Sequence, residues 1–148
     1  MACPVSFATM WQNYPTEDHD ALFKALGWDS LIDNANYTNT CAIRMSVCLL
    51  RSGVSVGGND LLIQKGPLKG KGVKTRFNEL ANYLAVHWGA PEKFPSVKAD
   101  DVKGRQGVIA YFKLPGGYPG HIDLINAQGE PGHATYFGSQ EGWFWPAK

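Results

Sequence analysis

The sequence is short of three things that would each define a class of protein. It has no run of about 18 apolar residues, so it predicts no membrane insertion. Its formal net charge is only +1, whereas a nucleic-acid-binding domain usually carries a strong basic excess. Its three cysteines are an odd number, which does not suit a disulfide framework. We therefore expect no nucleic acid partner and synthesis in a reducing compartment.

The N-terminus also lacks a recognisable export signal. MACPVSFATMWQNYP has neither the basic start nor the apolar core of a secretory signal peptide. If the protein works outside the cytoplasm, we expect export by a route without a cleaved signal. The sequence does contain material for a core, since 44% of its 148 residues are hydrophobic and 12% aromatic. This length suits one domain over residues 1–148, which can bury about 68–70% of its unfolded surface.

Helical patterns fill the first two-thirds of the chain and β patterns the last third. Helices are predicted over residues 6–14, 18–28, 40–53 and 75–89, and strands over 107–113, 120–126, 133–137 and 142–146. The Gly- and Lys-rich residues 55–74 predict an exposed loop or ragged hairpin, and residues 89–106, with two prolines, predict a loop. Helices followed by an antiparallel sheet indicate the α+β class.

Cys41 stands in TNTCAIRMSVCLLRSG, at the predicted start of the third helix. Free backbone N–H groups and the positive end of the helix dipole gather there, and both stabilise a nucleophilic thiolate. The alternative is a small buried hydrophobe, as free cysteines often are. Cys48 lies two turns deeper and is expected in the core. Seven residues of helix separate the two Cα atoms by about 10 Å, too far for a disulfide.

Two of the four histidines, His121 in PGHIDLI and His133 in PGHATYF, each begin a predicted strand after a glycine. In a tight hairpin with these two residues opposite, their Cβ atoms would lie about 4.5–5.5 Å apart. One ring could then act as base for a cysteine while the other orients it. Zinc is an alternative, with Asp123 and Cys41 completing four ligands. The spacings of zinc sites and of phosphate-binding loops are absent, so we expect no metal and no cofactor.

A cysteine at a helix start and a histidine at a strand start about eighty residues later form a papain-like layout, close to small cell-wall peptidases of the NlpC type. Four features more specifically resemble the type VI secretion amidase effectors, fourth family: NTCAIRMS, GRQGVIAYF, GHIDL and the Trp-rich C-terminus. SFATMWQNYP and RFNELANYLAVHWGAPEKF fit the same family. The resemblance covers essentially the whole chain.

This resemblance implies a single cysteine amidase domain in which N-terminal helices carrying the cysteine pack on a C-terminal antiparallel sheet carrying the histidine. It implies an antibacterial effector, made in the cytoplasm and injected by the type VI secretion machinery into the periplasm of a rival Gram-negative cell. There it would cut the peptidoglycan stem peptide between γ-D-glutamate and meso-diaminopimelate. A dedicated immunity protein would neutralise it, and the basic segment from Lys65 to Lys74 is expected to meet an acidic surface of that partner.

The resemblance assigns Cys41 as nucleophile and His121 as base, but leaves the third catalytic residue open. The family typically has an acidic residue some way after the histidine, and NAQGEPGHATYF here contains no Asp and no Cys. NlpC-type relatives often use a second histidine about twelve residues on. We therefore predict that His133 orients the His121 ring, with Asp123 and Glu130 as alternatives.

Substrate contacts are predicted on both sides of the nucleophile. Asn39 could help to hold the oxyanion, Arg44 could flank the cleft or form a structural ion pair, and Asp123 could meet the free amine of diaminopimelate. Two other functions use the same fold: a cysteine deamidase or protease acting on proteins, and a non-catalytic peptidoglycan-binding or inhibitor domain. The presence of both Cys41 and His121 argues against the second, but does not exclude the first.

Overall fold

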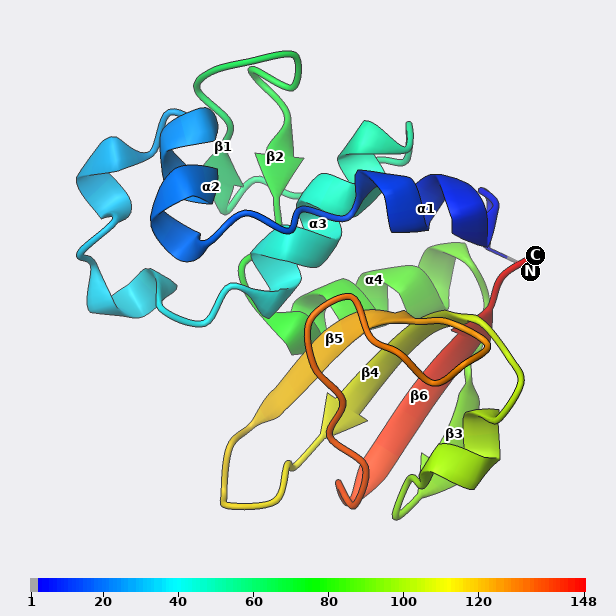
Figure 1. Cartoon of the computed structure of the whole chain (residues 1–148). Coiled ribbons are helices and arrows are strands. Elements are labelled where there is room, and N and C mark those ends of the chain that lie inside the picture. The colour runs from blue at the N-terminus through cyan, green and yellow to red at the C-terminus, as the bar shows by residue number, and fades with distance from the viewer. Residues whose placement is uncertain (1–2) are drawn as a thin grey trace.

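The computed structural model describes residues 3–148 and shows helices packed on an antiparallel sheet (Figure 1). The helices are α1 (Phe7–Asn13), α2 (His19–Ala25), α3 (Cys41–Arg51) and α4 (Phe77–His87), with the short 3-10 helices η1 (Asp29–Leu31), η2 (Ala35–Tyr37) and η3 (Ala99–Val102). The strands are β1 (Leu61–Leu62), β2 (Gly72–Val73), β3 (Glu92–Pro95), β4 (Gly107–Phe112), β5 (Gly120–Ile125) and β6 (Glu141–Pro146). The predicted α+β class is confirmed. No helix within the described residues is long and apolar enough to cross a membrane.

The main sheet has the strand order β3-β6-β4-β5, and every neighbouring pair is antiparallel. Strand β5, which carries His121, therefore lies at an edge, and only β4 pairs with it along its length. Strands β1 and β2 form a separate two-stranded hairpin, as the ragged pattern of residues 55–74 predicted. The free edge of β5 is thus open to contacts from other parts of the chain.

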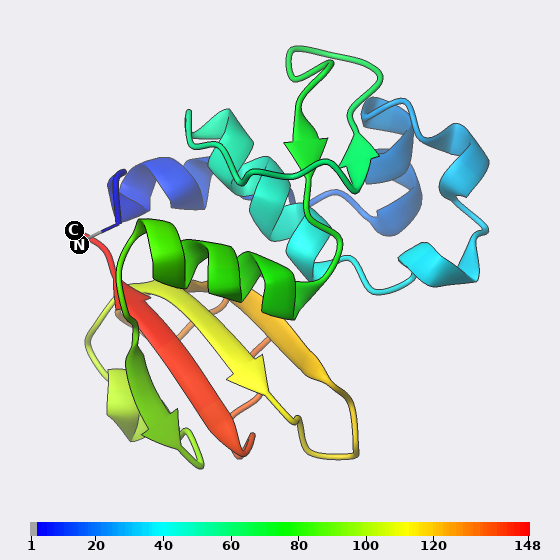
Figure 2. The same ribbon diagram turned by 180° about the vertical axis from the view of Figure 1, so that it is seen from behind.

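Helix α3 lies between the sheet on one side and α2 with the β1–β2 hairpin on the other (Figures 1 and 2). All of residues 41–49 are buried. Ile43 and Val47 pack toward α2 and the hairpin, whereas Met45 and Cys48 belong to the cluster against the sheet. The sequence predicted one apolar stripe; the helix is buried on both sides because it is the central element of the fold.

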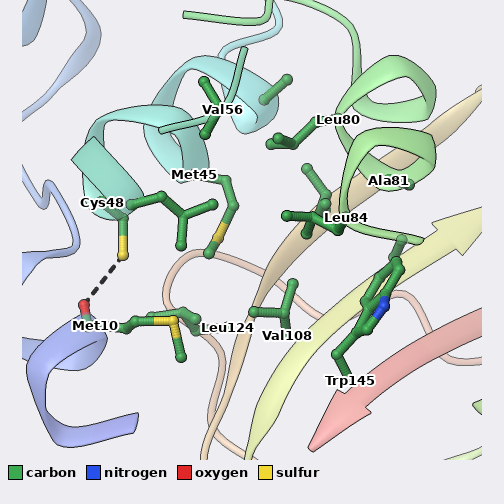
Figure 3. Close-up of a cluster of buried hydrophobic side chains, with 14 of the residues drawn as sticks. Met10, Met45, Cys48, Val56, Leu80, Ala81, Leu84, Val108, Leu124 and Trp145 are labelled. Carbon is green, nitrogen blue, oxygen red and sulfur yellow. Dashed lines mark hydrogen bonds between the residues drawn. The ribbon is translucent and has the colours of Figure 1, made fainter. Parts of the chain in front are cut away.

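The larger core cluster joins α1, α3 and α4 to the sheet (Figure 3). Cys48 is fully buried, as predicted, and its Sγ donates to the Met10 carbonyl over 3.2 Å. The predicted apolar face of α4 is also confirmed, since Leu80, Leu84 and Trp88 are buried there. This packing fixes α3 against β5, the two elements that carry the predicted cysteine and histidine.

The opposite face of the sheet is covered by residues 126–140 and η3 (Figure 1). The predicted strand over residues 133–137 is wrong, because the chain makes one isolated bridge, Ile125 to Pro131, and then leaves the edge of β5. The predicted loop over residues 89–106 is wrong as well, since it contains β3 and η3. β3 tolerates Pro95 because it is an edge strand that, within the described residues, pairs only with β6.

Candidate active site

Cys41 is the first residue of α3, so the predicted helix start is confirmed. Its side chain is nearly buried, and its backbone N–H donates to Asn39 Oδ1 over 3.3 Å. The first turn, residues 41–44, contains no acidic side chain, and the Thr40 side chain caps none of its N–H groups. The positive end of the helix dipole is therefore left for whatever group stands at Cys41.

His121 lies near the start of β5 and is 5% exposed. Its Nε2 is 2.8 Å from Asp123 Oδ2. Burial lowers the pKa of the imidazole, but the hydrogen bond to Asp123 and the interaction with Cys41 outweigh burial and raise this pKa to about 9. The structure thus brings the predicted nucleophile and base together, and the ring is mostly protonated at neutral pH.

Asp123 has no exposed surface, and its carboxylate is satisfied by four donors. Oδ2 lies 2.8 Å from His121 Nε2 and accepts the backbone N–H groups of His133 (3.0 Å) and Ala134 (2.9 Å). Oδ1 accepts the N–H of Leu124 over 2.7 Å. Asp123 therefore presents no exposed surface to a substrate in this structure. The residue holds the His121 ring from inside the protein.

The prediction that His133 orients the His121 ring is also wrong. The bridge between Ile125 and Pro131, continued along the chain, would place His133 opposite Asp123 and not opposite His121. The His133 ring centroid lies 6.3 Å from that of His121, and the residue is exposed. His133 therefore contributes its backbone N–H to the Asp123 carboxylate, while its side chain makes no bond to the His121 ring.

A glycine and a tyrosine that the sequence analysis did not single out shape the surroundings of Asp123. A Cβ at Gly132 would lie 2.6 Å from Asp123 Oδ1 and 2.9 Å from Tyr14 Cε2, so only glycine permits this close approach. The Tyr14 hydroxyl is buried without a hydrogen-bond partner among residues 3–148. Neither residue stands in a recognisable motif, and only the three-dimensional packing identifies them.

Arg44 does not flank a cleft and forms no ion pair within the described residues. It is buried, its Nε donates to Thr40 Oγ1 over 3.1 Å, and its Nη1 donates to the carbonyls of Pro15 (3.1 Å) and Glu17 (2.7 Å). The ion-pair interpretation of Arg44 is therefore wrong within the described residues, while its contact with a substrate stays a prediction. Its guanidinium instead ties the start of α3 to the segment that follows α1.

The two remaining predicted residues lie at the surface. Asn39 is exposed, and its Oδ1 accepts the Cys41 N–H, so it acts as an acceptor in the resting site. Its part in oxyanion binding stays a prediction. Glu130 is exposed and accepts from Asn126 Nδ2 over 2.9 Å in the turn after β5. It is not the partner of the His121 ring.

Comparison with known proteins identifies the family. The sequence profile described as type VI secretion system (T6SS) amidase effector protein 4 matches residues 37–145. The chain belongs to this family. The match includes Cys41, His121 and Asp123. As a member, the protein is an antibacterial peptidoglycan amidase that is secreted and acts in the periplasm of target cells.

Solved structures of the type VI effector Tae4 share the fold of this chain. Tae4 from Enterobacter cloacae superposes with a TM-score of 0.81 at 22% identity, covering 100% of both chains. The Tae4–Tai4 effector–immunity complex from Enterobacter cloacae gives 0.80 at 21% identity, covering 99% of this chain and 100% of the other. The Tae4–Tai4 complex from Salmonella Typhimurium gives 0.76 at 21% identity, covering 97% and 98%. No curated protein sequence matches the chain.

Proposed function

We propose that the protein hydrolyses the amide bond between γ-D-glutamate and meso-diaminopimelate in peptidoglycan stem peptides, with Cys41 as nucleophile and His121 as acid and base. The observation that carries this proposal is the His121–Asp123 hydrogen bond of 2.8 Å beside the first turn of α3. It fixes an imidazole next to a cysteine that occupies the positive end of a helix dipole.

The first half of the reaction forms a thioester. Asp123 occupies Nε2 of His121, which leaves Nδ1 for Cys41, and at neutral pH the ring already holds the thiol proton as an imidazolium beside the Cys41 thiolate. The thiolate sulfur bonds to the amide carbonyl carbon, and the carbonyl oxygen becomes an oxyanion. This oxyanion replaces Asn39 Oδ1 as the acceptor of the Cys41 N–H. The C–N bond then breaks as His121 protonates the leaving amine.

The second half releases the acid product. Water gives a proton to the neutral His121 ring, and its oxygen attacks the thioester carbonyl. The C–S bond breaks, and the Cys41 thiol regains its proton. Asp123 stabilises the imidazolium in both halves, in line with the raised pKa of about 9 for His121. A protonated ring at neutral pH is what amine departure needs.

Digestion of purified sacculi, with the released muropeptides read by mass, tests the reaction. We expect fragments that end in γ-D-glutamate and fragments that begin with the free amine of diaminopimelate. Protein alkylated at Cys41 with iodoacetamide is the control and should release nothing. Binding to sacculi without release would favour a peptidoglycan-binding domain. Deamidation of a protein glutamine without muropeptide release would favour the deamidase.

We also propose that the protein is made in the cytoplasm and harms a Gram-negative cell only from the periplasm, where the stem peptides are. Expression in such a host with a fused signal peptide should cause lysis, whereas the same chain kept in the cytoplasm should not. Equal toxicity from both forms would count against peptidoglycan as the target.

The partner that we propose is an immunity protein, as in the Tae4–Tai4 complexes that share this fold. We place it over the site at Cys41 and His121, with the basic segment 65–74, in which Lys65, Lys69 and Lys71 are exposed, against an acidic surface. Charge reversal at Lys69 and Lys71 should slow association with the cognate immunity protein, and more so at low salt. An unchanged association rate would remove this segment from the interface.

A further inference from the structure

Arg44 is a buried cation that no carboxylate neutralises within residues 3–148. It is 6% exposed, and its hydrogen bonds end on a hydroxyl and two backbone carbonyls, those of Thr40, Pro15 and Glu17. The Glu17 carboxylate pairs instead with Arg51, over 3.7 Å. Buried charges in proteins are normally paired, because an unpaired charge in the interior is costly. Arg44 is therefore a buried positive charge with no anion bound to it within residues 3–148.

The position of the Arg44 guanidinium makes its unpaired charge still more costly. Its bond to Thr40 places it at the N-terminal end of α3, where the helix dipole already contributes positive potential and disfavours a cation. Arg44 follows Cys41 by three residues, a spacing that brings Cβ atoms within about 5–6 Å on one helix face. The helix dipole and the guanidinium thus both favour a negative charge at Cys41.

The other titratable groups around this helix end do not supply that charge. Burial raises the pKa of the Tyr14 hydroxyl, at the end of α1, of the Tyr111 hydroxyl on β4, and of the Cys48 thiol on α3, so all three stay neutral. After β2, the Lys74 ammonium lies over the ring of Tyr83 on α4, at 5.4 Å from its centroid. None of these groups is an anion at neutral pH.

Asp123 on β5 is the only buried carboxylate within residues 3–148, and His121 already pairs with it. The Asp123 carboxylate is bound by His121 and by three backbone N–H groups, so it does not pair with Arg44. We propose that Arg44 is a positioning residue whose buried charge stabilises the Cys41 thiolate. This inference rests on the proposed role of Cys41 as nucleophile.

The test measures the reactivity of Cys41 directly and needs no peptidoglycan. Iodoacetamide alkylation is followed by peptide mass mapping, which separates Cys41 from Cys3 and Cys48. In Arg44→Gln we expect the Cys41 rate to fall about tenfold at pH 6, because the nucleophilic thiolate loses a nearby opposite charge. At pH 9 the loss should shrink to less than about threefold, since a free thiol ionises there unaided.

Two further variants separate charge from packing. Arg44→Lys keeps the charge and should stay within about threefold of the wild-type rate at pH 6. Arg51→Gln removes the same charge from the exposed end of the same helix, about 15 Å from Cys41 at 1.5 Å per residue, and should leave the rate unchanged. A folded Arg44→Gln with the wild-type rate at pH 6 would overturn the proposal.

The remaining outcomes also decide whether the charge of Arg44 stabilises the Cys41 thiolate. If Arg44→Gln does not fold, Arg44→Lys decides alone: a tenfold loss at pH 6 would mean that hydrogen-bond geometry matters rather than charge. Wild-type Cys41 that reacts at pH 6 no faster than an unstructured cysteine peptide would overturn the proposal without any variant. If alkylation behaves as expected while sacculi stay intact, the substrate assignment fails and the role of Arg44 stands.

Discussion

Helices α3 and α4 are both eleven residues long, but their first turns are built differently. Helix α4 has Glu79 in its first turn and His87 in its last, which suits the helix dipole at both ends. Helix α3 has no acidic side chain in its first turn, and it has the buried cation Arg44 there instead. The first turn of α4 favours stability of the free helix, whereas that of α3 reserves a positive environment for Cys41.

The largest effect should come from removing the thiol of that first turn. Cys41→Ala should lower sacculus turnover by about a thousandfold or more, because no other group forms the thioester. Cys48→Ala, on the same helix, removes an equal thiol from the core and should keep turnover while losing about 1–2 kcal/mol of unfolding free energy. Folding of both variants is checked by circular dichroism. Equal turnover of the two variants would break the contrast between the helix start and the helix interior.

The next effect concerns the partner of the imidazole that faces this helix start. Asp123→Asn should lower turnover about a hundredfold or more, since an amide both loses the negative charge and brings N–H groups against the N–H groups of His133 and Ala134. His133→Ala keeps the backbone donor and should lower turnover less than about threefold. A greater loss in the His133 variant would restore the two-histidine arrangement.

The raised pKa of His121 should also appear as a pH-dependent stability. A histidine whose folded-state pKa is raised adds stability that is complete below its unfolded pKa of 6.5 and is lost as pH rises through about 9. As the pH rises from 6.5 to about 9, the unfolding free energy of the wild-type protein should therefore fall by up to about 3 kcal/mol more than that of His121→Gln. Urea unfolding at several pH values measures this difference. If the unfolding free energies of the two proteins change with pH in parallel, Asp123 and Cys41 do not stabilise the protonated His121 ring.

The smallest effect should come from the first turn of α4. Glu79→Gln removes a favourable charge–dipole interaction and should cost about 0.3–1 kcal/mol of unfolding free energy. Turnover should not change, since α4 carries none of the proposed catalytic residues. A drop in turnover with this variant would mean that α4 also takes part in catalysis. It would contradict the contrast between a catalytic first turn in α3 and a purely stabilising one in α4.

The sequence was sufficient to place Cys41 at a helix start and His121 at a strand start, because each stands at an element boundary with a strong local signal. Cys41 follows a capping segment and precedes a long apolar period, and His121 follows a glycine at the start of a β-branched run. Helix starts and strand starts are local properties. The fold class followed for the same reason, since the order of helical and β patterns is visible along the chain.

The hydrogen-bond partner of the His121 ring could not be predicted because it depends on non-local geometry. Asp123 stands about 6.5–7 Å along the strand from His121. That spacing separates the backbones, and the imidazole extends far enough to bring Nε2 within 2.8 Å of Oδ2. The position of His133 depended on the register after β5. The chain leaves the strand edge after the bridge at Pro131, which no local pattern indicates.

The most direct test of the account is to trap the covalent intermediate. Wild-type protein mixed with purified muropeptides, quenched in acid within the first turnover and digested, should show an adduct on the peptide that contains Cys41. Its mass should equal the acyl part of the cleaved muropeptide, and Cys41→Ala should show none. Products that accumulate with no adduct at Cys41, or with an adduct on another residue, would contradict a nucleophile at the first turn of α3.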